Sequence, residues 1–501
     1  MLSTLRAWTR PRRLSRQALV LALTAVALVA AASSAAAAQV HIVRQGAPPA
    51  VVPPNTEYFT TIQAAVNAST AGDWVLVEPG TYKEAVKVTS AQSGIWIRGM
   101  NRNMVIIDGQ SKAGNGVEVF KANNVYVENL TVRNFDTGSE AEPCPTTGCG
   151  NDIWWNGGGD SGKVGAHGWW GRYLTTYDTG LNGGYGIFTG NETEGEWSNI
   201  YASGFNDSGM YLGACQECDA KITKATMENN ALGYSGSNSG GNLIIEKSLI
   251  RNNGSGIAPN SENPGDGPPP QDGECGRPNI ENPNPEPLIT TTRIKRCTII
   301  RNNVITENNN LTVPINGSTA PAPWGTGVLL AGDYADLVTK NTITNNANDG
   351  ILGFEFANPF TPENNFEGTL FFQFAGNKLS DNTFSNNGYR GGWPFTGDIA
   401  MMGGFSELFP GTRYPESHSV DNCAIANTMP DATFPAEIER TWGCQHSQTP
   451  SPGGGELAID YLLTLPAEAP SAGERSPQPA PAAQPTMPNP CKGVPRNPLC
   501  R

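Results

Sequence analysis

Two aspartates, Asp178 and Asp207, have the type and setting that acid–base chemistry on a polymer would need. Each stands at a polar turn after a short apolar run, and the two turns are successive in the chain. If the turns lie on neighbouring parallel strands, the carboxylates would be about 5 Å apart, which suits the paired acids of a glycoside hydrolase. We therefore take both as candidate catalytic residues. Aspartates at turns also commonly cap backbone amides, so the structural role stays open.

Aromatic residues gather just before and around these acids. Exposed aromatic rings stack on sugar faces, and Arg172 lies close by in the sequence. The candidate binding set is Trp154, Trp155, Trp169, Trp170, Tyr211 and Arg172. The alternative is that the tryptophans, which lie among glycines, pack their segment onto the body as a small satellite core.

A repeat in the middle of the chain indicates which elements would position these residues. The segments FNDSGMYLG, ENNALGYSG and RNNGSGIAP share a polar corner, a glycine and a short alternating run, and the corner asparagines Asn206, Asn230 and Asn253 recur every 24 and 23 residues. A fixed period in the twenties is typical of stacked solenoid coils. A β-sandwich would instead need tight hairpin turns between strands, and these repeats rarely show them.

The first coils carry the most specific pattern. Residues 57–88 contain TIQAAV, GDWVLVEPGTY and a following strand, and they are succeeded by IWIRG and IIDG. Ile62, Ala65 and Val66 predict a short amphipathic helix. This stretch resembles the N-terminal cap and first coils of the pectin-lyase-like superfamily, whose secreted members include the β-helix repeat proteins. The resemblance implies an all-β, right-handed, single-stranded parallel β-helix with an N-terminal cap helix.

In this superfamily the active site lies on the outer face of one parallel sheet, between long loops. Alternation after each glycine corner predicts an inward row and an outward row. The inward row is Ile187, Met210, Tyr234, Ile257, Val328 and Ile351. The outward row is Glu118, Phe188, Tyr211, Ser235, Ala258, Leu329, Leu352 and Ala400. It holds one acid and no Lys or Arg, so it supplies neither the base and cation of a lyase nor the carboxylates of a hydrolase. Any site would need corners and loops as well.

The chain divides into five predicted parts. These are a signal peptide at 1–38, a lead segment at 39–56, a β-helix at 57–450, a linker rich in proline and alanine at 451–490, and a tail closed by cysteines at 491–501. Loop insertions are expected at 136–171, 260–290 and 310–324. One short helix is expected at 455–465, and disorder over 466–490.

The first 38 residues combine a basic start, an apolar run and an alanine-rich cleavage region, which predicts export and a secreted or extracytoplasmic location. The apolar run is too short for a membrane span. The whole chain has a formal charge of −13. Removing the export segment takes away five arginines and no acid, so nucleic acid and anionic membranes are poor partners. We expect a monomer.

Ten cysteines occur as near neighbours, and an exported chain favours local disulfides. The sequence does not determine their pairing. The candidates are Cys144, Cys149, Cys215, Cys218, Cys275, Cys297, Cys423, Cys444, Cys491 and Cys500. Cys215 and Cys218 are also spaced like a redox or zinc motif, but no second ligand cluster accompanies them. We expect no cofactor, with calcium at Asp266 and Asp272 as the one metal to consider.

Two functions remain. The first is a glycan-directed protein that binds a polysaccharide or cell-wall glycan, or cleaves it as a lyase or hydrolase. The second is a non-catalytic extracellular or cell-surface solenoid that serves structure or interaction. The tryptophans and the family resemblance favour the first, whereas the acidic charge and the mostly uncharged outward row favour the second.

Overall fold

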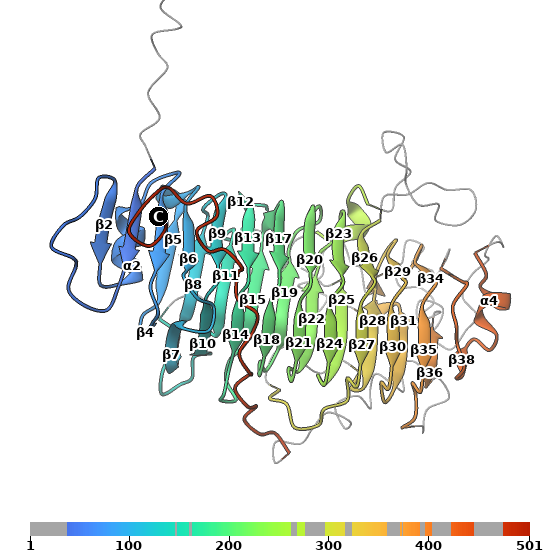
Figure 1. Ribbon diagram of the computed structural model, residues 1–501. Helices are drawn as coiled ribbons and strands as arrows, with labels where there is room; N and C mark the ends of the chain where they lie inside the picture. Colours follow the sequence, from blue (N-terminus) through green and yellow to red (C-terminus); the bar gives the residue numbers. More distant parts are fainter. Residues whose placement is uncertain are drawn as a thin grey trace, which may run out of the picture. The chain divides into compact units, whose positions relative to one another are not determined.

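Three long parallel β-sheets form the body of the protein (Figure 1). The computed structural model describes residues 38–145, 148–159, 163–261, 268–275, 296–315, 323–357, 371–372, 374–390, 396–402, 422–444 and 474–501. The predicted export segment up to residue 37 and the predicted helix at 455–465 lie outside them. No helix in the described residues is long and apolar enough to span a bilayer.

Each sheet contains one strand from nearly every coil. In spatial order, sheet A contains β2 (Thr56–Phe59), β1 (Val40–Val43), β3 (Trp74–Val77), β6 (Trp96–Gly99), β9 (Val125–Glu128), β13 (Trp169–Arg172), β17 (Gly195–Ser198), β20 (Ala220–Thr223), β23 (Leu243–Glu246), β26 (Thr298–Arg301), β29 (Leu337–Thr339), β34 (Lys378–Ser380) and β37 (Cys423–Ile425). Sheet B contains β4 (Gly80–Tyr82), β7 (Val105–Ala113), β10 (Thr131–Asp136), β14 (Thr175–Tyr177), β18 (Tyr201–Ser203), β21 (Thr226–Glu228), β24 (Leu249–Arg251), β27 (Val304–Thr306), β30 (Thr342–Thr344) and β35 (Thr383–Ser385). Sheet C contains β5 (Val86–Thr89), β8 (Asn115–Phe120), β11 (Asn151–Asn156), β15 (Tyr185–Gly190), β19 (Ser208–Gly213), β22 (Leu232–Ser237), β25 (Ser255–Asn260), β28 (Thr326–Ala331), β31 (Asp349–Phe354), β36 (Gly397–Met401) and β38 (Thr433–Phe434).

The remaining elements are small. The strands β12 (Ala166–His167) and β16 (Glu192–Thr193) pair in parallel, and β32 (Phe356–Ala357) and β33 (Phe371–Phe372) pair antiparallel. The helices are α2 (Ile62–Ala68), α4 (Ile438–Thr441) and the 3-10 turns η1 (Ser90–Gln92) and η2 (Pro270–Asp272).

The chain winds through sheets A, B and C in turn, as β17, β18 and β19 are followed by β20, β21 and β22. Parallel crossover connections of this kind are right-handed. The fold is therefore the right-handed parallel β-helix that the sequence predicts. The predicted inward row is also confirmed, because its six residues pair in register along sheet C and are fully buried.

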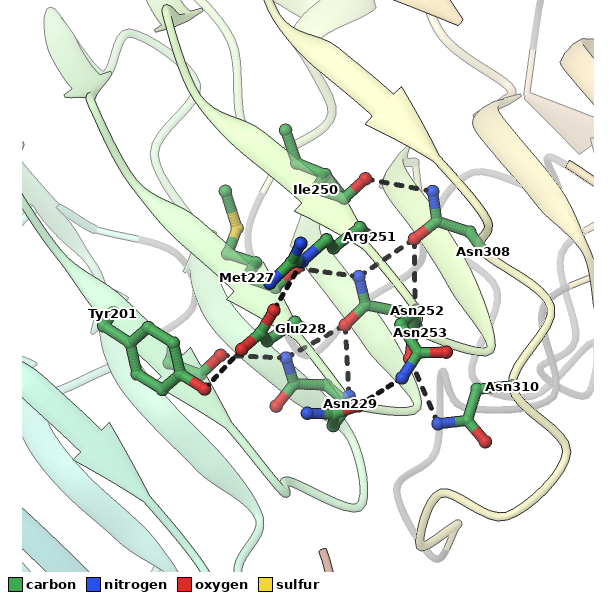
Figure 2. Close-up of polar contacts among 12 residues, drawn as sticks. Tyr201, Met227, Glu228, Asn229, Ile250, Arg251, Asn252, Asn253, Asn308 and Asn310 are labelled. Atoms are coloured by element: carbon green, nitrogen blue, oxygen red, sulfur yellow. Dashed lines mark hydrogen bonds and ion pairs between the residues drawn. The ribbon is translucent and has the colours of Figure 1, made fainter. Parts of the chain in front are cut away.

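Asparagines build the corners of the coils. A left-handed residue marks the bend between sheets, as at Asn129 (φ 57°) and Asn229 (φ 60°), a backbone that asparagine tolerates. After Asn229, as at the same bend of the later coils, the next residue is an asparagine that points inward and bonds its counterpart on the following coil. At the bend between sheets B and C this ladder joins Asn230, Asn253, Asn308, Asn346 and Asn387 with side-chain amide bonds of 2.9–3.1 Å. Figure 2 shows Asn253 and Asn308 in this ladder.

The helix α2 forms where the sequence predicts one. The Thr61 hydroxyl accepts a hydrogen bond from the N–H of Ala64 and so caps the helix start. Ile62, Ala65 and Val66 are fully buried. The helix packs against β5 and the first strands of sheet A, so it lies at the first coil; its role as a cap remains a prediction.

The expected insertion at 136–171 is wrong in part. Residues 151–156 form β11 and residues 169–172 form β13, so this stretch is an ordinary coil with loops on either side. Its core positions hold tryptophan in place of the usual aliphatic residues. In the expected insertion at 310–324, Trp324 packs with Val313 and Ile315 in a small core that is separate from the main one.

All ten cysteines form disulfides between near neighbours, as expected. The pairs are Cys144–Cys149, Cys215–Cys218, Cys275–Cys297, Cys423–Cys444 and Cys491–Cys500. Cys215 and Cys218 are thus bridged to each other and fully buried, which agrees with the structural interpretation.

The end of the chain differs most from expectation. Residues 474–501 run back over the early coils instead of lying disordered (Figure 1). Hydrogen bonds tie this segment to Thr312, Asn129, Asn103 and Arg98 of the body. The proline-rich composition of this segment predicted disorder. Its order could not be foreseen, because its hydrogen-bond partners are remote in sequence.

Candidate functional site

A row of aromatic side chains lies on the outer face of sheet C. Trp154 of β11 pairs with Phe188 of β15, and Phe188 pairs with Tyr211 of β19. On one side the row begins with Glu118 of β8, and on the other it continues with Ser235 of β22. The predicted outward row is therefore confirmed over these coils, with Trp154 added to it.

The rings in this row do not all face the same way. Phe188 and Tyr211 are stacked, with centroids 4.5 Å apart and planes 8° apart. Trp154 stands edge-to-face with Phe188 at 5.4 Å and 83°. Tyr185 packs against both rings, at 4.9 and 5.3 Å, and Tyr211 is buried beneath these neighbours. The half-buried Trp154 is turned crosswise, so stacking along the row does not cover its indole.

A pocket of about 390 Å³ opens over this row. Its lining includes Trp154, Phe188, Tyr211, Lys121, Asn156 and Asn191. Lys121 and Asn191 have left-handed backbones at φ 51° and 60°, since they stand where the coil leaves sheet C. An apolar floor with a few amides and one ammonium group is the usual composition of a small-molecule pocket.

Glu118 is the one acidic residue of the row at this end, and its carboxylate is already engaged. It lies 3.2 Å from the ammonium of Lys87 and accepts a hydrogen bond of 3.2 Å from the amide of Asn156. A second pocket, of about 330 Å³, lies beyond it, and its lining includes Glu118, Glu84, Asp108 and Lys87. No acidic residue of the described chain lines the aromatic pocket itself.

The predicted catalytic aspartates do not reach this surface. Asp178 is buried, and its carboxylate accepts hydrogen bonds from the N–H groups of Gly180 and Gly183 at 3.0 and 2.7 Å. Burial raises the pKa of Asp178, and these backbone bonds oppose the rise. Asp207 is also buried and accepts a bond of 2.7 Å from the Ser208 hydroxyl. Asp178 thus caps its own turn, and neither aspartate lines the pocket over the aromatic row. A catalytic role for the two stays a prediction.

Two of the predicted binding tryptophans belong to the core. Trp155 and Trp169 are fully buried and pack against Trp197 at 6.2 and 4.8 Å. They cannot touch a ligand on the surface. The parity of β11 and β13 explains the error, since each strand presents one tryptophan inward and its neighbour outward.

Trp170 and Arg172 lie on the outer face of a different sheet, sheet A. Trp170 ends a stacked column whose other members are Trp74, Trp96 and Tyr126, with spacings of 4.7–5.7 Å. Arg172 lies over the Trp170 ring at 5.7 Å and near Glu128 and Glu196. The structure therefore brings together Trp154 and Tyr211 and separates them from Trp170 and Arg172. Lys121, Asn156 and Asn191 were not singled out from the sequence. Only their position at the ends of strands could have indicated that they belong to the site.

The described residues contain no group of three or more His, Cys, Asp or Glu side chains that could hold a metal ion. Asp266, one of the two candidate calcium ligands, lies outside them, and only the backbone of Asp272 is described.

No family model and no curated protein matches this chain. Solved structures do. The A-module of mannuronan C-5 epimerase AlgE4 from Azotobacter vinelandii is 13% identical over 73% of this chain and 90% of its own, with a TM-score of 0.38. Pectate lyase Pel9A is 13% identical over 82% and 81%, with a TM-score of 0.38. The tailspike protein of E. coli bacteriophage HK620, in complex with a pentasaccharide, is 12% identical over 82% and 61%, with a TM-score of 0.41.

Proposed function

We propose that the outer face of sheet C binds a carbohydrate chain at Trp154. The observation that supports this most is the crosswise indole in an open pocket of about 390 Å³ with two asparagine amides and a lysine on its wall. An indole stacks on the C–H face of a sugar, while amides and an ammonium group bond its hydroxyls.

Binding is favoured over cleavage by the charges of the site. Hydrolysis needs two carboxyl groups on either side of the glycosidic bond, and Glu118 is a single carboxylate held by Lys87 and Asn156. A lyase needs a base with a cation beside it, and Lys121 has no acidic partner in the described ion pairs. The formal charge of −13 also disfavours strongly anionic polymers.

The test compares two tryptophans of similar burial on different sheets. A panel of neutral and acidic glycans identifies a ligand, and calorimetry measures its affinity for the wild type, Trp154→Ala and Trp170→Ala. We expect Trp154→Ala to weaken binding at least tenfold, which corresponds to about 1.4 kcal/mol, and Trp170→Ala to bind like the wild type.

Three outcomes would contradict the proposal. If no glycan binds, the non-catalytic interaction solenoid becomes the better interpretation. Equal losses in both variants would place the ligand elsewhere or indicate general unfolding, which melting curves separate. New reducing or unsaturated ends in the incubated glycan would show that the protein cleaves its ligand, contrary to a binding role alone.

A further inference from the structure

The C-terminal segment, residues 474–501, is held by the body at widely separated places. At its start, the N–H of Ser476 and the side-chain amide of Gln478 donate to the carbonyl of Thr312 at 2.8 and 3.0 Å. At its far end, Gly493 lies beside Trp74 of β3. The segment therefore connects a late coil to the first coils, across the bend between sheets A and B (Figure 1).

Exposure along this segment has a period of three. The less exposed residues between 477 and 490 are Gln478, Pro481, Gln484, Met487 and Pro490, while those between them are exposed. A polyproline II helix has three residues per turn and no internal hydrogen bonds. The pattern indicates such a helix with one edge against the body. The prolines of this stretch preset that shape, so little backbone freedom is lost when it docks.

The body presents matching polar groups at this bend. The side chain of Asn103 both accepts from the N–H and donates to the carbonyl of Gln484, each at 2.8 Å. The side-chain oxygen of Asn129 accepts from the N–H of Met487 and the hydroxyl of Thr486, each at 2.8 Å. The side chains of Asn103 and Asn129 thus bond the backbone of the C-terminal segment as a neighbouring β-strand would, although the segment has no regular secondary structure.

Two buried arginines complete the surface. Arg98 donates to the carbonyls of Pro490 and Lys492 at 2.9 and 2.8 Å, and Glu128 neutralises its charge. Arg102 donates to the carbonyl of Pro485 at 3.1 Å, and its other nitrogens bond Thr175 and Leu174. Both arginine residues are over nine-tenths buried. Without the segment, each would lose acceptors that water would have to replace.

We propose that the bend between sheets A and B over β6, β9 and β14 is a binding groove for a polyproline II peptide, and that its ligand is the C-terminus of the same chain. The disulfide Cys491–Cys500 closes a loop inside the segment and does not bond it to the body. The groove therefore holds the segment by noncovalent contacts alone, and it retains the segment after the connecting chain is cut.

The experiment uses the full-length protein with a specific protease site placed between residues 451 and 473. After complete cutting under native conditions, gel filtration at micromolar concentration should recover the 474–501 fragment with the body, and denaturant should release it. Hydrogen exchange on the uncut protein should show protected amides at Gln484 and Met487. Separation of the fragment without denaturant, or free exchange at these amides, would overturn the proposal.

A matched pair of variants tests the groove itself. Gln484→Pro keeps the polyproline II shape but removes the N–H that Asn103 accepts, whereas Ala483→Pro is a control because no described group accepts the N–H of Ala483. With the cut protein, we expect Gln484→Pro to weaken retention of the fragment up to about tenfold, because it removes the hydrogen bond from the N–H of residue 484 to Asn103. Ala483→Pro should bind as the wild type does. Equal behaviour of the two variants would contradict the assigned contacts.

Discussion

Three buried carboxyl groups, of Asp136, Asp152 and Asp178, lie close together at the bend that leads into sheet C. Asp152 accepts hydrogen bonds from the N–H groups of Phe135 and Tyr177, on successive coils. Burial raises the pKa of all three, and the charge of Asp178 adds to the rise for Asp136 and Asp152. Asp152 thus accepts backbone N–H groups at this bend, as the ladder asparagines do on later coils, and all three carboxyl groups are costly to bury in the charged form. Their cost to stability should therefore depend on pH.

Asp136 is the one whose titration falls in an accessible range, because burial and then the charge of Asp178 raise its pKa to about 6. In the unfolded chain it loses its proton near the ordinary value of 3.8. The folded state thus carries almost no penalty below pH 4, the penalty grows between about pH 4 and pH 6, and it stays constant above that. We expect Asp136→Asn to stabilise the protein by about 1–3 kcal/mol at pH 7 and hardly at pH 4. Urea unfolding at both pH values measures this.

The exposed corner variant Asp381→Asn is the matched control for Asp136→Asn. It makes the same chemical change, from Asp to Asn. The backbone of Asp381 is left-handed, a conformation that asparagine also tolerates. It should leave the free energy of unfolding unchanged at both pH values. If the free energy of unfolding of Asp136→Asn depended on pH as that of the wild type does, the carboxyl of Asp136 would not titrate as its burial requires.

At the scale of the elements, stacked coils are joined by side chains as well as by their sheets. Asn253 is fully buried, accepts from the N–H and side-chain amide of Asn230, and donates to Asn308 and to the carbonyl of Met227 (Figure 2). One side chain thus serves three coils. Outside the same bend, Asn252 bonds Asn229 where water can reach both. The two neighbours should differ sharply in their effect on stability.

We expect Asn253→Ala to lower the free energy of unfolding by about 2–4 kcal/mol, because it leaves buried donors and the Met227 carbonyl without partners. Asn252→Gly keeps the left-handed backbone and removes only an exposed bond, so it should cost under about 1 kcal/mol. Denaturant titration with circular dichroism compares them. Similar losses in both variants would mean that the ladder contributes no more than the surface pair.

At the scale of the whole molecule, the winding was predictable because its signals are local and repeated. The inward row from Ile187 to Ile351 needed only period-2 alternation after each corner. The site was only partly predictable. Adjacent tryptophans such as Trp154 and Trp155 point to opposite faces of the sheet, and the sequence did not show which of the two points inward. The C-terminal segment was not predictable, because its partners lie 160 to 394 residues away and a polyproline II helix has no internal bonds to signal order.

A solenoid whose coils contact only their neighbours should fail locally at an end when an end is weakened. Cys423 begins β37, the last strand of sheet A, and its bond to Cys444 ties the chain after α4 to that strand. Replacing both cysteines by alanine removes a constraint worth about 3 kcal/mol for a loop of this length. We expect faster hydrogen exchange in β37 and unchanged protection at Asn230 and Asn253.

The double variant Cys144→Ala, Cys149→Ala is the control for that experiment, because its disulfide closes a loop near the other end of the β-helix. Exchange in β37 should not respond to it, since many coils intervene and each transmits stability only to the next. If instead the loss of Cys423–Cys444 exposed the central ladder as well, the coils would have to unfold as one cooperative unit. In that case the asparagine ladders, which run without a break from Asn230 to Asn387, would be the structures that couple them.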